Sequence, residues 1–384
     1  MRVLGVVCEY NPFHRGHAAQ IAALRAEFPE KPIVLVMSGN FTQRGEAAIT
    51  DRCTRARAAL SSGADLVLEL AFPYSCLGAK EYAKCALSVL ERLGCVDTLA
   101  FGVRGLDREL LLRLGALLRS EAFEARLSEN LRNADAHSAY AYVREQTLTS
   151  FVPEAAGLLR DPNHILALEY AAFGGSFALC PVERKGEDQA SELRKLLREN
   201  KEIDAFLPEN VARIYRKAAS EGRFPADTGA LDQALLYHLR LHGGGAFLGF
   251  LGDRIRTCAV QSASFSEFLS RAKTSRVPIA RLRRGALLEY LGAEPDDTLS
   301  LPLYNMVLGA SERGRMLLRT LRKKSRVPLY TRAGDLKRTD DPAFARAVRL
   351  AADADAIYAA LIGKSGDYFW KQTPNYEQIV NFSE

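Results

Sequence analysis

Two histidines near the start of the chain have the spacing and the setting of a phosphate-binding turn. His14 and His17 are three residues apart with Gly16 between them, and they closely follow a mostly apolar run over residues 2–8. Such a run predicts a strand that leads into a first helix. A helix N-terminus offers free N–H groups and a positive dipole end, imidazoles there can donate hydrogen bonds to phosphate oxygens, and glycine lets the backbone approach closely.

The chemistry that this pattern favours is nucleotidyl transfer. A nucleophile that displaces pyrophosphate from the α-phosphate of a nucleoside triphosphate needs positioning and charge neutralisation more than covalent help. Asn11 and Pro12 shape the turn, and His14 and His17 are the expected catalytic residues. Read alone, the two histidines also fit an ordinary turn, but their place after the first strand favours a function. The histidines at 137, 164, 238 and 242 stand alone and are expected to be structural or exposed.

Strand and helix patterns alternate over the first hundred residues. The continuous apolar run at 33–37 predicts a strand that is buried on both faces, and 66–70 and 98–101 are predicted to be further strands. Helical periodicity fills the segments between them. This alternation predicts an α/β fold with a doubly wound parallel sheet and right-handed crossovers. Because such sheets bind ligands beyond the carboxyl ends of their strands, the His14 turn stands where a ligand is expected.

The chain is too long for one comfortable core, and we expect two domains. The charged segment 199–204 precedes Leu207-Pro208 and gives the expected boundary. Residues 1–200 are predicted to form the nucleotidyltransferase-like, ATP-binding catalytic domain, with a fifth strand at 177–182. Residues 201–384 are predicted to form a mostly helical second domain, in which 328–331 is the best candidate for a strand.

Positive charge is concentrated in the second half of the chain. Residues 1–200 hold 24 Lys and Arg against 25 Asp and Glu, whereas residues 201–384 hold 28 against 21. Within residues 271–338 the balance is 16 against 6. An asymmetry of this kind indicates an acidic partner, with nucleic acid as the leading candidate. A solvated surface with a basic bias is the alternative.

Two groups of basic residues are the candidates for contacts with RNA phosphates. They are Lys273, Arg276, Arg281, Arg283 and Arg284 in the first group, and Arg315, Arg319, Arg322, Lys323 and Lys324 in the second. In the second group the spacings of four and three put three arginines on one helix face. Arg44 lies with Asn40 and Gln43 in a polar loop after the second strand, and this loop is expected to contact substrate or RNA.

The seven cysteines form no C-x-x-C pair and are expected to be buried thiols in a reducing compartment. The first apolar run is too short for a signal peptide and meets Glu9 directly. No apolar stretch has the length of a membrane span. We therefore expect a cytoplasmic protein.

Longer strings around these features resemble one family. The string VVCEYNPFHRGH at 6–17 is similar to the bacterial tRNA(Met) cytidine acetate ligases, within the HIGH-type nucleotidyltransferase superfamily. Further similar strings are MSGNFTQRGE at 37–46, GADLVLEL at 63–70, Phe101-Gly102, Pro162-Asn163, ILA at 165–167, Glu169-Tyr170, LGASERG at 308–314 and KKS at 323–325. The resemblance thus extends over nearly the whole chain.

The resemblance implies an enzyme that uses ATP to convert acetate to acetyl-adenylate and then acetylates N4 of the wobble cytidine of elongator tRNA(Met). It implies that ATP is a substrate and that Mg²⁺ accompanies it. It implies no interaction with a membrane or with DNA. No carboxylate cluster is clear enough to name as a metal site of the protein. Carried over by position, the ATP contacts are Val7, Cys8, Glu9, Tyr10, Asn11, Pro12, Phe13, His14, Gly16, His17, Gln20, Gly102, Asn163 and Arg184.

One segment departs from the family pattern. Residues 185–194 replace a longer loop with glycine and histidine, and Ser191 and Arg194 at a helix start are the candidates for triphosphate contacts there. Arg194 is also compatible with a surface helix. Two rival functions stay open: transfer of a nucleotide to a small phosphorylated metabolite, and tRNA binding by a protein with a degenerate nucleotide site.

Overall fold

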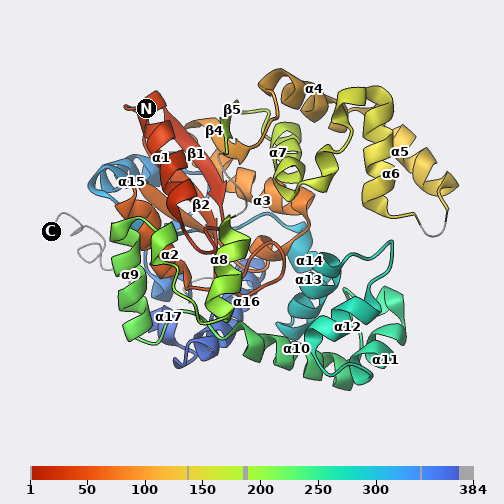
Figure 1. The fold of residues 1–384 in the computed structure, drawn as a ribbon. Coiled ribbons are helices and arrows are strands. Elements are labelled where there is room, and N and C mark those ends of the chain that lie inside the picture. The colour runs from red at the N-terminus through yellow and green to blue at the C-terminus, as the bar shows by residue number, and fades with distance from the viewer. Residues whose placement is uncertain (1, 136–137, 185–188, 338–339, 372–384) are drawn as a thin grey trace.

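A seven-stranded sheet runs through the middle of the molecule (Figure 1). The computed structural model describes residues 2–135, 138–184, 189–337 and 340–371. The sheet has the order β5-β4-β1-β2-β3-β6-β7. Its strands are β1 (Val3–Cys8), β2 (Ile33–Ser38), β3 (Leu66–Leu70), β4 (Val96–Val103), β5 (Ala178–Glu183), β6 (Asn305–Ala310) and β7 (Leu329–Tyr330).

The first five strands are parallel, which confirms the predicted α/β class. Val6 of β1 is in register with Leu35 of β2 on one side and with Ala100 of β4 on the other. The carboxyl ends of β1 to β5 therefore lie along one edge of the sheet, and loops that leave this edge can meet there.

Strand β6 lies in the second half of the chain, where the sequence predicts mostly helices, although its residues 306–310 are apolar throughout. It pairs antiparallel with β3, and β7, inside the predicted segment 328–331, pairs parallel with β6. The sheet thus takes strands from both sides of residue 200. The domain boundary near that residue stays a prediction.

Helices cover both faces of the sheet, and further helices extend to one side of it (Figure 1). In the first part of the chain they are α1 (Arg15–Glu27), α2 (Arg52–Ser61), α3 (Ala79–Arg92), α4 (Arg108–Leu118), α5 (Glu121–Asn133), α6 (Tyr140–Phe151), α7 (Pro162–Phe173) and α8 (Gln189–Arg198). The later helices are α9 (Glu209–Ser220), α10 (Thr228–His242), α11 (Arg254–Val260), α12 (Phe265–Ala272), α13 (Ile279–Tyr290), α14 (Pro295–Leu299), α15 (Glu312–Lys324), α16 (Pro342–Leu361) and α17 (Tyr368–Lys371).

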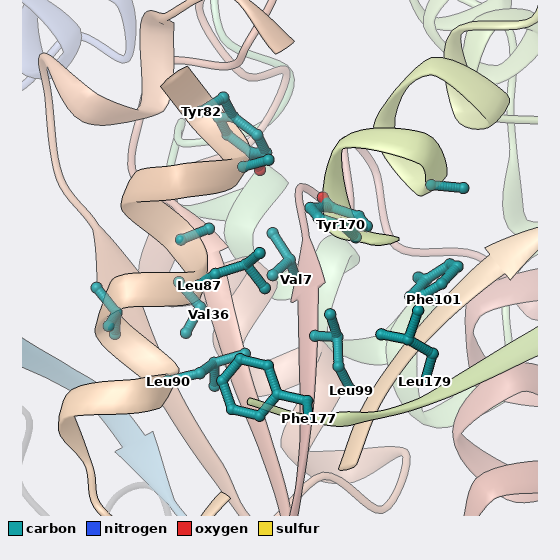
Figure 2. Packing of buried hydrophobic residues seen from close by; sticks show 14 of the residues in the cluster. Val7, Val36, Tyr82, Leu87, Leu90, Leu99, Phe101, Tyr170, Phe177 and Leu179 are labelled. Carbon is teal, nitrogen blue, oxygen red and sulfur yellow. The ribbon is translucent and has the colours of Figure 1, made fainter. Parts of the chain in front are cut away.

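Alternating side chains of each strand enter two different cores. Val7 and Val36 pack with α3, α4, α7 and α15 on one face (Figure 2), whereas Val6 and Leu35 pack with α1, α2, α8 and α9 on the other. A third core joins α10 to α13 with α16 and α17. All seven cysteines are free thiols. None of the described helices combines the length and the hydropathy that a membrane-crossing segment needs.

A buried group of charges ties α16 to the sheet. Arg52 of α2 forms ion pairs with Glu69 of β3, at 3.1 Å, and with Asp355 of α16. The Asn40 amide donates to Asp355 as well, at 2.9 Å. Because one guanidinium faces two buried carboxyl groups, a proton on one of them balances the charge. Burial, with the Asp355 charge adding to it, raises the pKa of Glu69 to about 7.

Replacing Glu69 by glutamine should remove a pH-dependent part of the stability. A carboxyl group whose pKa is higher in the folded than in the unfolded protein stabilises the fold at low pH, and this stabilisation is lost as pH rises toward the folded pKa. We therefore expect the Tm of the natural protein, relative to Glu69→Gln, to fall by a few degrees between about pH 5 and pH 8. Thermal unfolding of both proteins across this range tests the expectation, and a difference that is independent of pH would contradict it.

Candidate active site

A cavity of about 660 Å³ lies at the carboxyl edge of the parallel strands. Its walls come from the end of β1, the loop after β2, the end of β4, the start of α7, and helices α8 and α13. Of the sequence-predicted ATP contacts, it is lined by Val7, Cys8, Glu9, Tyr10, Asn11, His17, Gln20, Gly102, Asn163, Arg184 and Arg194. These residues are spread over almost two hundred positions, and the fold brings them to one hollow.

The two histidines of the turn have different positions. His14 is the N-cap of α1: its Nδ1 accepts from the Gly16 N–H at 3.0 Å, and it is 3% exposed. His17 lines the cavity, and its Nδ1 faces the His14 N–H at 3.3 Å. The two rings lie against each other, with centroids 3.8 Å apart. His14, with Pro12, Phe13, Gly16 and Ser191, lies outside the cavity wall.

These hydrogen bonds decide which nitrogen of His17 can serve a ligand. Because Nδ1 accepts a backbone hydrogen bond, a neutral ring carries its proton on Nε2. Burial lowers the pKa of His17 well below its usual value, and His14 and Arg184 lower it further. His17 is therefore a neutral ring at pH 7 that can donate from Nε2 without itself bringing charge.

The turn is held in place by groups far away in the sequence. The Asn11 side chain accepts from the Ile49 N–H at 2.7 Å. The Phe13 N–H donates to the hydroxyl of Tyr215, on α9, at 2.8 Å. Tyr10 has a φ of 51°, in the left-handed region that non-glycine residues seldom adopt. Conformations of this kind persist where surrounding contacts over-determine them, and they are concentrated at functional sites.

Arg55 of α2 joins the ends of the two central strands. Its side chain is completely buried and donates to the carbonyl of Glu9 at 2.6 Å, of Ser38 at 3.0 Å and of Thr50 at 3.0 Å. It also donates to the carbonyl of Gly39. The strand ends and the loop after β2 thus share one guanidinium.

Gly102, near the end of β4, lies directly against the side chain of Arg184. A Cβ atom on Gly102 would lie 2.9 Å from both Cγ and Cδ of Arg184, and 3.6 Å from Nε2 of Gln20. The missing side chain thus leaves room for the arginine stem over the end of β4. Arg184 follows β5, and its N–H donates to the carbonyl of Val103 at 2.7 Å.

Asn163 and Arg194 approach the cavity from two helices. Asp161 caps α7 by accepting from the Asn163 N–H at 2.8 Å and from its side-chain amide at 3.0 Å. Arg194 of α8 donates to the carbonyl of Asn11 at 2.6 Å and to the Ser191 hydroxyl at 3.0 Å. Arg194 is thus a wall residue of the cavity. Of the divergent segment, residues 185–188 lie outside the described part of the chain.

The basic residues expected to bind RNA fall into separate places. Arg44, Arg283 and Arg284 line the cavity. Lys273, Arg276 and Arg281 are exposed before and at the start of α13. Gly45 is packed against α13, since a Cβ there would lie 2.8 Å from the backbone N and Cα of Arg284. The first basic group is therefore continuous with the cavity.

The second basic group lies at the other edge of the sheet. Ser311 donates its N–H to the carbonyl of Asp65, just before β3, and Arg313 bonds the carbonyl of Pro29, before β2. These contacts put α15 along the amino-terminal ends of the strands, beside the N-terminus in Figure 1. Its exposed residues include all five basic side chains of the second group, Arg315, Arg319, Arg322, Lys323 and Lys324.

Several residues of the site have no sequence signal that a single chain reveals. Arg55 and Tyr215 act through contacts with distant segments. Tyr82 looks like an ordinary helix position, and Tyr170 stands in a string similar to the family but has no predicted role; Tyr82 and Tyr170 both line the cavity. In Figure 2 the hydroxyl groups of these last two tyrosines point toward each other. Asn40 is the reverse case, a residue that the sequence assigns to the site and the structure does not. It is 3% exposed and is bonded to Asp355 and Arg52, so the expectation that it contacts substrate is wrong.

Of the solitary histidines, His164, His238 and His242 lie outside the cavity wall. His164 bonds the carbonyl of Arg104 at 2.7 Å. His238 and His242 lie together on α10, with ring centroids 4.9 Å apart. His137 is outside the described residues.

Comparison with known proteins identifies the family. The chain matches the family model described as HIGH Nucleotidyl Transferase over residues 1–371. It is 31% identical to a tRNA(Met) cytidine acetate ligase of Clostridium kluyveri, over 88% of this chain and 93% of that protein. It is 32% identical to one of Syntrophotalea carbinolica, over 89% of this chain and 88% of that protein.

A solved structure agrees with this result. The crystal structure of Thermotoga maritima TmcAL bound with alpha-thio ATP matches with a TM-score of 0.88 at 29% identity, covering 98% of each chain. The chain belongs to the HIGH nucleotidyltransferase family and, within it, to the tRNA(Met) cytidine acetate ligases.

Adding a methyl group to Gly102 should weaken nucleotide binding without unfolding the protein. In Gly102→Ala the Arg184 side chain must leave its place, and we expect ATP affinity to fall about tenfold, which is about 1.4 kcal/mol. The matched control is Gly334→Ala, since a Cβ there meets no atom within 4 Å. Calorimetric titration with ATP measures both variants. Unchanged affinity in Gly102→Ala would contradict a nucleotide contact by Arg184.

Proposed function

We propose that this enzyme converts acetate and ATP to acetyl-adenylate and pyrophosphate, and then transfers the acetyl group to N4 of the wobble cytidine of elongator tRNA(Met). The observation that carries the proposal is the H-x-G-H turn, whose His17 lines a cavity that also holds Arg44, Arg184, Arg194, Arg283 and Arg284. Five guanidinium groups around one hollow fit a site for a triphosphate and a second polyanion.

In the first step an acetate oxygen attacks the α-phosphate and pyrophosphate leaves. Acetate is ionised at neutral pH, because carboxyl groups titrate near pH ~4 to 5, so this step needs no base. His17 is proposed to donate from Nε2 to a phosphate oxygen, and Arg184 and Arg194 to offset the charge of the triphosphate. His14, as N-cap of α1, is proposed to orient His17 through the backbone.

In the second step the cytosine amine attacks the acetyl carbonyl and AMP leaves. The amine lone pair is delocalised into the ring, so it needs an activated acyl donor, and the mixed anhydride with AMP is such a donor. The base must leave its stack to reach the cavity. The first basic group, which is continuous with the cavity, is proposed to hold the phosphates around that nucleotide.

The second basic group, on α15, is at the opposite edge of the sheet. We propose that it meets a different part of the tRNA from the part that holds the wobble base. Within the described ranges, no three His, Cys, Asp or Glu side chains come together as a protein metal site requires. The residues present therefore do not form a cage for Mg²⁺, and an ion that accompanies ATP would be held by phosphate oxygens and water. A tRNA substrate is cytoplasmic, and we propose that the enzyme works there.

Incubation with acetate, ATP, Mg²⁺ and tRNA(Met) should produce N4-acetylcytidine and AMP. Mass spectrometry of the digested tRNA and chromatography of the nucleotides measure the two products. His17→Ala should keep the fold and lose acetate-dependent pyrophosphate release by about 10²-fold or more, whereas His242→Ala, on α10 away from the cavity, should not change it. Absence of both acetylcytidine and AMP with the natural protein would overturn the proposed function, and RNA-independent turnover would favour the small-metabolite rival.

A further inference from the structure

Glu9 is the first residue beyond β1, and its side chain is an unusual feature of a site for anions. It lines the cavity at the point where the central strand ends. A carboxylate repels phosphate and acetate alike, so neither the triphosphate nor acetate explains it. It can instead accept from an amine, and both the adenine of ATP and the target cytosine carry one.

One oxygen of Glu9 is held and the other is open. Oε1 accepts from the Gln43 N–H at 2.7 Å, which fixes the carboxyl group against the loop after β2. Among the described residues, the second oxygen, Oε2, has no hydrogen-bond partner. It is also not fully enclosed by protein atoms. The carboxyl group is therefore anchored through one oxygen and presents the other to the cavity.

Charged and polar groups from several segments of the chain surround this carboxyl group. Arg44 in the loop after β2, Arg194 on α8 and Arg55 on α2 favour its ionised form, whereas burial raises its pKa above the usual value. The hydroxyls of Tyr82 on α3 and Tyr170 on α7 and the thiols of Cys8 and Cys76 are also near it. Within the described part of the chain no hydrogen bond involves the Tyr170 hydroxyl, and Tyr170 lines the cavity.

We propose that Glu9 binds the exocyclic amine of the target cytosine and accepts its proton when the acetyl group is transferred. A carboxylate that accepts from cytosine N4 is an established pairing of a side chain with a base edge. Uracil has a carbonyl oxygen at the same position, so the same group would discriminate against uridine. This assignment rests on the proposed function, because it concerns its second step alone.

The transfer balances without another reagent. The N4 lone pair forms a bond to the acetyl carbonyl carbon, and the bond from that carbon to the phosphate oxygen breaks with its electron pair on AMP. The amine nitrogen loses one proton, which passes to Oε2 of Glu9. A positioned base of this kind accelerates proton transfer by about 10² to 10⁴-fold.

Glu9→Gln separates the two steps. The glutamine oxygen can still accept from the Gln43 N–H, so the loop keeps its anchor, but the charge and the basicity are lost. We expect acetyl transfer to tRNA(Met) to fall by about 10²-fold or more, and acetate-dependent exchange of pyrophosphate into ATP, measured without tRNA, to fall much less. Glu9→Asp should recover part of the transfer rate. The matched control is Glu124→Gln, an exposed carboxyl on α5.

The pH dependence gives a second readout that a structural role would not produce. Transfer from preformed acetyl-adenylate should slow as pH falls through the raised pKa of Glu9, while exchange should not follow that titration. Equal losses of exchange and transfer in Glu9→Gln, unchanged transfer, or one shared pH profile would overturn the assignment. If the natural protein makes no acetylcytidine at all, the proposed function itself fails, which is a different result.

Discussion

The site depends on one buried guanidinium. Arg55 forms no ion pair in the described residues; its four hydrogen bonds go to the backbone carbonyls of Glu9, Ser38, Gly39 and Thr50. Carbonyl groups at the ends of parallel strands must find donors when they are buried, and each one left alone costs about 1 to 3 kcal/mol. A single planar side chain meets this need for β1, β2 and the loop between β2 and α2. The loop that leaves β1 here carries Glu9 and His14 and leads into α1, which carries His17.

Elements from the second half of the chain support the sheet and form part of the cavity wall. Tyr215 on α9 accepts from the Phe13 N–H, Asp355 on α16 pairs with Arg52 beside the loop after β2, and β6 extends the sheet next to β3. Arg283 and Arg284 of α13 form one wall of the cavity. A basic segment is thus part of the hollow at the sheet edge, so a polyanion bound along α13 would lead directly into it.

Much of this arrangement can be predicted from the sequence, and the rest has physical reasons for staying hidden. Runs such as residues 33–37 predict a parallel sheet because strands buried on both faces are apolar throughout. The setting of His14 and His17 predicts a turn at the ligand edge of the sheet, where His17 lines the cavity. Arg55 and Tyr215 are invisible because their roles depend on contacts across many residues. The expectation that Asn40 contacts substrate fails for the same reason. A polar loop residue points inward when a distant buried charge, here Asp355, needs a donor.

The most direct test is a crystal structure of the protein with a non-hydrolysable analogue of acetyl-adenylate. The account predicts density in the cavity at the carboxyl edge, with Nε2 of His17 about 3 Å from a phosphate oxygen, Arg184 over Gly102 beside the nucleotide, and the acyl carbon facing Glu9. An analogue bound elsewhere on the protein, or one whose adenine ring occupies the space beside Glu9, would contradict it.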